Sequence, residues 1–299
     1  EYQIVLGQLH EALQTKPATL LRWPRAEGEG GSGSAVTAAM RSDRDQRPSV
    51  EIHSICAYKP DETSKTGADS PLPGLSVPNH QAYADRHGYR YVVHTKLPLP
   101  DVEAHYSKMF VIFNRFTETA SVAENSPTPD WILFVDCDAF FTNFDVSIHD
   151  LLWTYAGREE ARGPGDGGTH FIVAEDPGGI NTGVFLVRNS PWSLDFLARV
   201  SRSLFTVAWD QSMFFWEIVR SALDMNLEAF QADFRYPTEV KLVHQAHLNA
   251  FVPPASRDWM AHEWRPGDFV RHFAGCPWQE PHCLKMMQET AAAAGTPQK

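Results

Sequence analysis

The sequence predicts an α/β fold in which a mostly parallel sheet is covered by helices. Apolar, β-branched runs alternate along the chain with longer segments whose apolar residues have helical spacing. The strand expected at 131–136 opens with five apolar residues, WILFV, which is typical of a central strand buried on both faces. Hydrophobic residues make up 43% of the 299 residues, enough for a sizeable core. Alternating strands and helices are the pattern of an α/β sandwich.

The folded part begins with a strand–helix–strand unit. Residues 49–58 predict a strand from their β-branched alternation. A helix is expected from residue 77 and ends at Gly88, because glycine readily takes the left-handed conformation of a C-cap. A second strand follows at 90–95. Residues 105–124 then carry aromatic and apolar side chains three and four positions apart, which predicts an amphipathic helix.

After the central strand we expect a helix, a loop and two further strands. The helix is expected at 145–156, with Asp145 as its N-cap. The glycine-rich segment 157–168 indicates a loop. The apolar runs at 169–176 and 183–189 each predict a strand.

The last third of the domain is expected to hold two helices and two short strands. The helix at 190–205 opens with Ser-Pro, a favoured helix start. A second helix is expected at 209–223, and short strands at 240–244 and 268–275. No internal repeat is visible in the sequence.

Composition divides the chain into three parts. Residues 1–47 are rich in Gly, Ser and charged residues, and are expected to form a stem or linker after a short helix. Residues 48–287 are expected to form the folded domain, and 288–299 a flexible tail. No apolar run approaches the roughly 18–20 residues that cross a bilayer. An anchor preceding Glu1 stays open.

Charge and cysteine content narrow the classes of partner and compartment. The chain has 26 Lys and Arg against 37 Asp and Glu, a net charge of −11, which argues against a nucleic-acid partner. The four cysteines form no paired C-x-x-C zinc framework. Cys276 and Cys283 are close enough in sequence to form a disulfide, which would fit an oxidising compartment. Two reduced thiols are the alternative.

Two aspartates follow the central strand with one residue between them. Asp136 and Asp138 lie at the carboxyl end of the strand, where α/β sheets bind ligands. Residues i and i+2 of an extended chain project to the same side, so the two carboxylates need a cation between them. Their hard oxygens suit Mn²⁺ or Mg²⁺, with phosphate and water completing the shell. The pattern indicates a metal site that holds a diphosphate. The alternative is one capping Asp and one solvated Asp.

Three later segments add polar residues near the ends of predicted elements. Gly179, Asn181 and Gly183 stand just before the strand expected at 183–189, where glycine permits close backbone approach to a ligand. The pair Asp210–Gln211 stands at an expected helix start, and His272 near another strand end.

Together, these motifs resemble glycosyltransferase family 34. The segments DCD, GGINTGVFLVRN, WDQS and HFAGC occur in the family's order, and NHQAYADRHGYRYVV upstream is also similar to it. The resemblance covers about residues 50–278. It implies a GT-A fold, a Rossmann-like nucleotide-sugar-binding mixed sheet flanked by helices. It also implies a retaining glycosyltransferase that moves a hexose or pentose from UDP-xylose, UDP-galactose or GDP-mannose to a glycan or polysaccharide acceptor.

The family pattern implies a role for each matching residue. Asp136, Asp138 and His272 would bind Mn²⁺, with Mg²⁺ as the alternative. Asp210 and Gln211 would lie beside the anomeric carbon. The residues implied in donor binding are Lys108, Asp136, Asn181, Gly183 and Gly275. The chain departs from the pattern where Trp-x-Lys has become Tyr-Ser-Lys, and where Cys283 lies farther from HFAGC than the second cysteine of many plant members.

The implied chemistry passes through an oxocarbenium-like state while a nucleoside diphosphate leaves. The metal would offset the charge on the leaving phosphate. We favour same-face substitution with Gln211 stabilising the cation, and leave open a transient nucleophile. Segments 157–168 and 248–264 are candidate acceptor loops, in which Trp259 and Trp264 could stack on sugar rings.

The resemblance further implies a location and partners. The family works in the Golgi lumen as type II membrane proteins, so 1–47 would be a stem after an anchor outside this chain. A homo-oligomer, or a hetero-oligomer with other glycosyltransferases, is expected. Three rival functions stay open: an inverting Asp-x-Asp glycosyltransferase of another family, an inactive carbohydrate-binding or scaffold subunit, and a metal-dependent phosphohydrolase, which would need more clustered ligands than the sequence offers.

Overall fold

The computed structural model describes the chain between residues 47 and 293, with gaps. The described residues are 47–57, 70–97, 103–118, 127–158, 161, 167–203, 207, 209–225, 237–252 and 261–293. The expected linker, Trp259 and much of the two candidate acceptor loops lie outside them, and a domain boundary at residue 48 stays a prediction. Within the described part, no helix is both long and apolar enough to cross a membrane.

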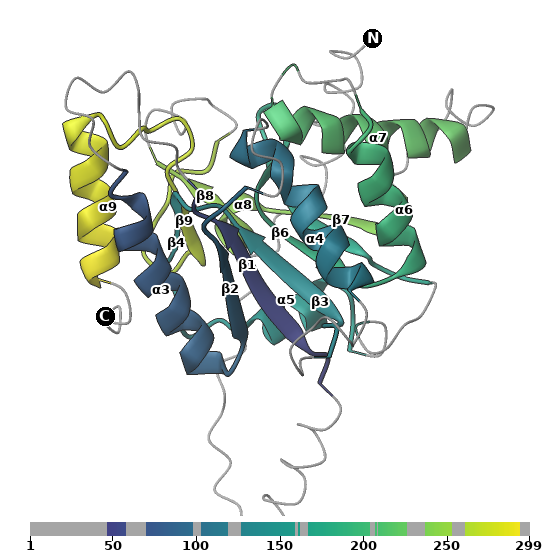
Figure 1. Ribbon diagram of the computed structural model, residues 1–299, viewed down its shortest axis with the longest axis horizontal. Coiled ribbons are helices and arrows are strands. Elements are labelled where there is room, and N and C mark those ends of the chain that lie inside the picture. Colours follow the sequence, from purple (N-terminus) through teal and green to yellow (C-terminus); the bar gives the residue numbers. More distant parts are fainter. Residues whose placement is uncertain are drawn as a thin grey trace, which may run out of the picture. The chain divides into compact units, whose positions relative to one another are not determined.

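A six-stranded mixed sheet carries the fold, in the order β2-β1-β3-β6-β5-β7 (Figure 1). β1 is parallel to both β2 and β3, and β5 is parallel to β7. β6 is antiparallel to both of its neighbours, β3 and β5. Five of the six strands therefore run in one direction and β6 runs against them, so the sheet is mixed and mostly parallel, as expected. The strands are β1 (Val50–Ile55), β2 (Arg90–His94), β3 (Trp131–Val135), β5 (Phe171–Asp176), β6 (Gly179–Arg188) and β7 (Val240–Val243).

The hairpin between β5 and β6 explains the change of direction. Only Pro177 and Gly178 connect the two strands, whereas a parallel crossover needs about a dozen residues. β6 begins at Gly179, which has φ +118° and packs against the ring of Phe215. Asn181 and Gly183 therefore lie inside the strand and not before it. The sequence pattern did not predict that the strand begins at Gly179, because glycine and asparagine are rare in strands.

β3 is the central buried strand that its apolar run predicts. All of its residues are buried, and so are all of those of β6 beside it. Phe134 of β3 stacks on Phe185 of β6, with ring centroids 5.4 Å apart. This packing fixes the end of β3, from which the two aspartates emerge.

A second, three-stranded sheet begins directly after those aspartates. It has the order β4-β9-β8, with bounds Ala139–Phe141, Val270–His272 and Ala250–Phe251. β4 is antiparallel to β9, and β8 is parallel to it. The turn that carries Asp136 and Asp138 therefore joins the two sheets.

Helices pack on the sheets, and several bounds follow the sequence closely. Figure 1 shows α3 beside α9, and α4 with α6 and α7 at the other side of the sheet. Gly88 caps α3 with φ 72°, as predicted. The Ser190 hydroxyl caps α6, also as predicted. The helices are α3 (Leu72–His87), η1 (Ala104–Ser107), α4 (Lys108–Thr117), α5 (Ile148–Tyr155), α6 (Pro191–Val200), α7 (Trp209–Met225), α8 (Gln245–Leu248) and α9 (Pro281–Ala293).

Three expectations about helix ends are corrected. The N-cap of α5 is Ser147 and not Asp145, because Ser147 and Asp150 form a reciprocal capping box. The helix expected at 105–124 is divided into η1 and α4, which ends at Thr117. The tail expected from residue 288 begins within α9, which continues to Ala293 because its alanines are strong helix formers.

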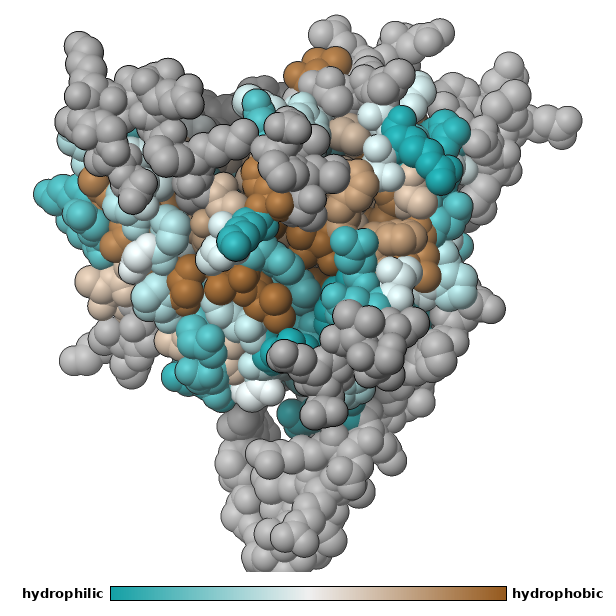
Figure 2. All heavy atoms as spheres, in the orientation of Figure 1, coloured by the Kyte–Doolittle hydropathy of each residue, from teal (hydrophilic) through white to brown (hydrophobic). Residues whose placement is uncertain are grey.

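Hydrophobic side chains also reach the surface. Figure 2 shows them between hydrophilic ones on the face seen there. Val207, Trp209 and Trp216 are large apolar residues that are exposed in the structure. Trp209 is exposed over 63% of its surface and lies next to Asp210, one of the predicted site residues.

Candidate active site

The turn after β3 is held on two sides by backbone hydrogen bonds. The Asp136 amide donates to the Gly183 carbonyl at 2.7 Å, and the Phe273 amide donates to the Asp138 carbonyl at 3.0 Å. The Ala139 amide closes the turn by donating to the Asp136 carbonyl at 3.1 Å. The two carboxylates therefore project from a fixed backbone at the edge where the sheets meet.

Strand pairing brings the third predicted metal ligand to the same place. His272 of β9 pairs with Ala139 of β4, directly after Asp138. Its Nε2 lies 3.4 Å from Asp138 Oδ1. One ligand atom from each of Asp136, Asp138 and His272 lies within 4.8 Å of the others. Asp136 and His272, which are 136 positions apart in the chain, thus belong to one cluster.

This cluster fits a divalent cation. In an octahedral shell with bonds of about 2.1 Å, neighbouring ligand atoms lie about 3 Å apart. Two carboxylates and an imidazole suit Mn²⁺. The carboxylate side chains of Asp136 and Asp138 stay 27% and 31% exposed, so an ion can reach them. The buried His272 Nδ1 has no hydrogen-bond partner among the described residues, typical of a shell that another group completes.

Gly183 gives the imidazole its space. A Cβ on this glycine would lie 2.3 Å from His272 Cε1. A side chain at this position would therefore displace the ring. The glycine that the resemblance assigns to donor binding has a demonstrable packing role, whereas its contact with a donor stays a prediction.

A bulge between β5 and β6 frees a backbone carbonyl of β6 from pairing with β5. Val173 of β5 pairs with Phe185, but the next residue, Ala174, pairs with Asn181. Residues 182–184 of β6 are consequently out of register with β5. The Thr182 carbonyl accepts from Lys108 instead, while the Gly183 carbonyl accepts from the Asp136 amide and continues the pairing with β3.

Lys108, the first residue of α4, is a buried clamp between two carboxylates. Its Nζ donates to Asp136 Oδ2 at 3.0 Å and to the Thr182 carbonyl at 3.0 Å. It also lies 3.1 Å from Asp210 Oδ2. Burial lowers the pKa of Lys108, but the two carboxylates raise it further, so the net shift is upward. With these acceptors the ammonium holds the site together; contact with a donor stays a prediction.

The pKa values of the two turn aspartates are shifted in opposite directions. Burial raises the pKa of Asp136 to about 6, against the attraction of Lys108 and with the repulsion of Asp138. Burial also raises the pKa of Asp138, but the charge and hydrogen bond of His272 outweigh it and leave that pKa lowered. The two neighbouring carboxylates repel each other, and a cation bound between them would relieve this repulsion.

Asp210 is placed at the beginning of α7 and is buried. Thr182 Oγ1 donates to Asp210 Oδ2 at 2.6 Å, the same oxygen that faces Lys108. Gln211 follows, and its Nε2 lies near Gly178, where a Cβ would be 3.5 Å away. The structure therefore brings Lys108, Asp136 and Asp210 into one network.

Asn181 is the centre of a second polar network. Its Oδ1 accepts from the Gly183 amide at 2.8 Å and from Asn249, and its Nδ2 donates to Asp176 Oδ2 at 3.2 Å. Asp176 and Asn249 were missed by the sequence analysis, as was Thr182. For Asp176 alone a signal was available, because it is the charged last residue of the strand expected at 169–176.

α3 supports strand β4, which follows the turn with the two aspartates. Asn79 Nδ2 donates to the Phe141 carbonyl at 3.0 Å, and the Phe141 amide donates back to Asn79 Oδ1 at 2.8 Å. His80 Nε2 pairs with the Ala139 carbonyl at 2.7 Å. Burial lowers the pKa of His80 to about 4, so its ring is neutral and donates from Nε2. The Asn79 and His80 side chains therefore hydrogen-bond to the backbone of β4, as a neighbouring strand would.

Gly275 and the exposed Trp209 are the remaining residues of interest. Gly275 takes φ 67° in the turn that follows β9, and its donor role stays a prediction. Trp209, which the sequence analysis missed as a candidate, has φ 50°. Its ring lies 6.5 Å from that of His105. A strained, exposed tryptophan beside Asp210 is a platform on which an apolar ring face could pack. Trp264 instead donates to Thr142.

Both cysteine pairs are disulfides. Cys276 bonds to Cys283, which decides the alternative left open by the sequence. Cys56 bonds to Cys137, a pairing that the sequence analysis did not propose. Cys137 is the residue between the two aspartates of the candidate metal site.

Comparison with known proteins places this site in a family. The model of the galactosyl transferase GMA12/MNN10 family, which is glycosyltransferase family 34, matches residues 55–160 and 166–283. The chain is similar to the "Probable alpha-1,2-galactosyltransferase gmh2" of Schizosaccharomyces pombe, 26% identical over 72% of this chain and 63% of that protein. It is also similar to the "Probable alpha-1,6-mannosyltransferase MNN10" of Saccharomyces cerevisiae, 24% identical over 69% of this chain and 56% of that protein.

Among solved structures, a glycosyltransferase involved in the glycosylation of the major capsid of PBCV-1 matches 81% of this chain and 100% of its own, with 19% identity and a TM-score of 0.49. The chain spans less than two thirds of the length of the two yeast relatives. The family model covers both halves of the cluster, the turn after β3 and strand β9. The chain belongs to the galactosyl transferase GMA12/MNN10 family.

Proposed function

We propose that the chain is a metal-dependent, retaining glycosyltransferase that uses a nucleotide-sugar donor. The observation that carries the proposal is the cluster of Asp136, Asp138 and His272, built from two sheets at the end of the central strand. Its ligand types suit Mn²⁺, with Mg²⁺ as the alternative. When bound, the ion would offset the charge that builds on the leaving diphosphate.

The protein side of the mechanism rests on the buried network. Lys108 holds Asp136 and Asp210 on its ammonium, so both carboxylates keep fixed positions during the reaction. Thr182 donates a hydrogen bond to the Asp210 oxygen that also faces Lys108. These two interactions lower the reactivity of that carboxylate and disfavour it as a nucleophile. Gln211, one residue on, is the neutral dipole that we assign to stabilising the developing oxocarbenium ion.

Retention then follows from same-face substitution. The acceptor hydroxyl oxygen bonds to the anomeric carbon while the bond from that carbon to the diphosphate oxygen breaks. The hydroxyl proton passes to the departing phosphate oxygen, so no separate base is required. The product is an α-linked sugar and a free nucleoside diphosphate.

Donor and acceptor are also part of the proposal. The relatives are named for α-galactosyl and α-mannosyl transfer, which favours UDP-galactose or GDP-mannose over UDP-xylose. The acceptor is a glycan or polysaccharide, and the exposed Trp209 beside Asp210 is the surface on which one of its sugar rings would pack. Two disulfides support an oxidising compartment, which we take as the Golgi lumen, with a type II anchor outside this chain. Assembly with itself or with other glycosyltransferases belongs to the same proposal.

The test combines metal dependence with donor identity. Mn²⁺ is titrated against the wild type and Asp138→Asn while UDP or GDP release is followed from a panel of nucleotide-sugars. Metal-dependent release from one donor, lost in the variant, supports the proposal and names the sugar. Binding of no nucleoside diphosphate with or without Mn²⁺ would contradict it and favour a carbohydrate-binding subunit. The anomer of the product, read by NMR, separates the retaining enzyme from an inverting one.

A further inference from the structure

A disulfide lies inside the metal-site turn, at the end of two neighbouring parallel strands. β1 and β3 pair in register from Val50↔Trp131 to His53↔Phe134. Cys56 and Cys137 have a sequence separation of 81, the same offset as Val50 and Trp131. The bond therefore continues the register of the two strands past the last paired residues, with Cα atoms 5.4 Å apart.

The disulfide supplies a third side of support for the turn. On one side Asp136 is tied to β6 through its amide, and on another Asp138 is tied to the chain after β9 through its carbonyl. The residue between them, Cys137, is linked by the disulfide to Cys56, which directly follows β1. Movement of this residue would change the distance between the carboxylates on either side of it. The bond thus acts on the spacing of the two ligands.

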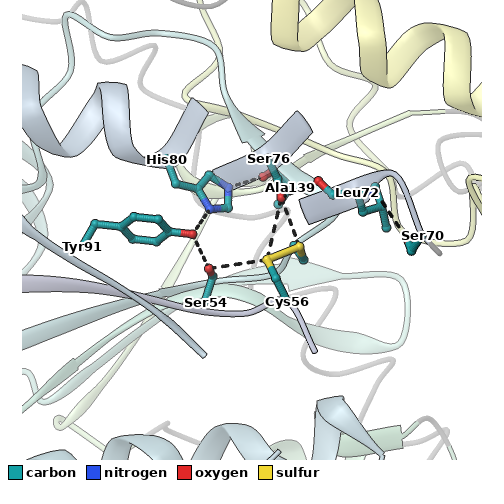
Figure 3. The surroundings of a disulfide bond; sticks show 9 residues. Ser54, Cys56, Ser70, Leu72, Ser76, His80, Tyr91 and Ala139 are labelled. Atoms are coloured by element: carbon teal, nitrogen blue, oxygen red, sulfur yellow. Dashed lines mark hydrogen bonds between the residues drawn. A yellow bond between two sulfur atoms is a disulfide. The ribbon is translucent and has the colours of Figure 1, made fainter. Parts of the chain in front are cut away.

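The disulfide is buried and lies among serine side chains. Cys56 and Cys137 are only 4% and 2% exposed. Figure 3 shows the bond between Ser54 on one side and Ser76 of α3 on the other. Ser76 Oγ lies 3.0 Å from Cys137 Sγ and donates to the Leu72 carbonyl at 3.0 Å. Burial at this level keeps reductants away, so the bond is a permanent part of the site.

The second disulfide is a built-in comparison. Cys276–Cys283 belongs to the same buried hydrophobic cluster as Cys56–Cys137, together with Phe140. It closes a short loop with a sequence separation of 7 and contains no metal-site residue. Any effect that comes only from loss of a disulfide in this cluster will appear in both pairs.

We propose that the Cys56–Cys137 disulfide is a positioning element of the metal site, which sets the spacing of Asp136 and Asp138 and so raises the affinity for the divalent cation. The inference rests on the proposed metal-dependent function. Formation of the bond oxidises two thiols, and the two electrons and two protons pass to an oxidised dithiol protein of the compartment in which the chain folds. The site is therefore completed only where such an oxidant is present.

The test compares Cys56→Ser/Cys137→Ser with Cys276→Ser/Cys283→Ser in the full chain. Mn²⁺ affinity is measured by calorimetry with UDP and with GDP, and by the electron paramagnetic resonance signal of free Mn²⁺, below the melting temperatures of both variants. We expect Mn²⁺ affinity to fall at least tenfold in the first variant and less than twofold in the second. Activity at saturating Mn²⁺ should recover in the first variant, because the ligands themselves are intact.

The possible results separate this inference from the proposed function. Wild-type affinity for Mn²⁺ in Cys56→Ser/Cys137→Ser, with metal-dependent activity in the wild type, overturns the inference alone. A wild type that binds no Mn²⁺ overturns the metal site and the inference together. If the serine pair does not fold, Cys56→Ala/Cys137→Ala takes its place, since alanine leaves no hydroxyl in the buried site; wild-type affinity in that variant equally overturns the inference.

Discussion

Replacement of Gly183 by alanine is expected to remove His272 from the metal site. The new Cβ would lie 2.3 Å from Cε1 of the imidazole and 2.9 Å from its Nδ1. Ordinary contacts between carbon atoms begin at about 3.5 Å, so the ring or strand β6 must move by roughly 1.2 Å. Metal–ligand distances tolerate about 0.2 Å, so the displaced ring no longer completes the shell.

The expected loss of Mn²⁺ affinity is about 10- to 100-fold, the usual effect of disturbing the support of a ligand. Overpacking adds a loss of about 1–3 kcal/mol in the free energy of unfolding. Calorimetric titration of Mn²⁺ in the presence of UDP measures the first quantity, and urea unfolding the second. Nucleotide-sugar hydrolysis should fall in proportion to metal occupancy.

Gly88→Ala is the matched control. Gly88 has φ 72° at the C-cap of α3, and a Cβ there meets nothing within 4 Å. The strain of a left-handed alanine costs about 1–2 kcal/mol without any change in the cluster. The reasoning is refuted if Gly183→Ala binds Mn²⁺ as tightly as Gly88→Ala does.

Three further changes test the networks around the site. Lys108→Met should destabilise the fold by about 3–5 kcal/mol in urea unfolding, because it leaves buried carboxylates without their cation; a stable variant would contradict the clamp. Burial alone would raise the pKa of Glu51, but the hydrogen bonds from Arg115 and from the neighbouring buried histidine lower it to about 2. Its stabilisation, roughly 3 kcal/mol, is then complete above about pH 4.5 and is lost as the pH falls toward 2. Urea unfolding between pH 3 and pH 7 should show this slope in the wild type and lose it in Glu51→Gln. Loop-closure entropy assigns about 4.5 kcal/mol of stability to the Cys56–Cys137 bond and about 2.4 kcal/mol to the shorter Cys276–Cys283 loop. The melting temperature should therefore fall more when Cys56 and Cys137 are replaced by serine than when Cys276 and Cys283 are; equal losses would contradict the estimate.

The sequence predicts the position of two candidate ligands well, because one short motif contains both of them. Asp136 and Asp138 follow an apolar run, and strand pairing places them as predicted. His272 was found only because a family pattern surrounds it, since the pairing of β4 with β9 joins positions far apart in the chain. Asn181 and Gly183 were found as residues, but their place inside β6 was not, because a bulged strand with glycine has no regular alternation.

The residues that the sequence missed are those that act across elements. Thr182 and Asn249 contribute to the site through buried hydrogen bonds to residues far away in the chain, which local sequence patterns do not predict. The Cys56–Cys137 pair had a usable signal, since two parallel strands in register place residues of equal offset side by side. That signal requires the pairing of β1 with β3, which local patterns do not determine.

The central claim is that Asp136, Asp138 and His272 hold a divalent cation together. Crystals of the protein grown with Mn²⁺ and UDP, with diffraction data collected at the manganese absorption edge, test it most directly. The account predicts one anomalous peak bonded to both carboxylates and to the imidazole nitrogen, with the diphosphate on its open side. A bound UDP with no anomalous peak at this cluster, or a peak elsewhere in the molecule, would contradict it.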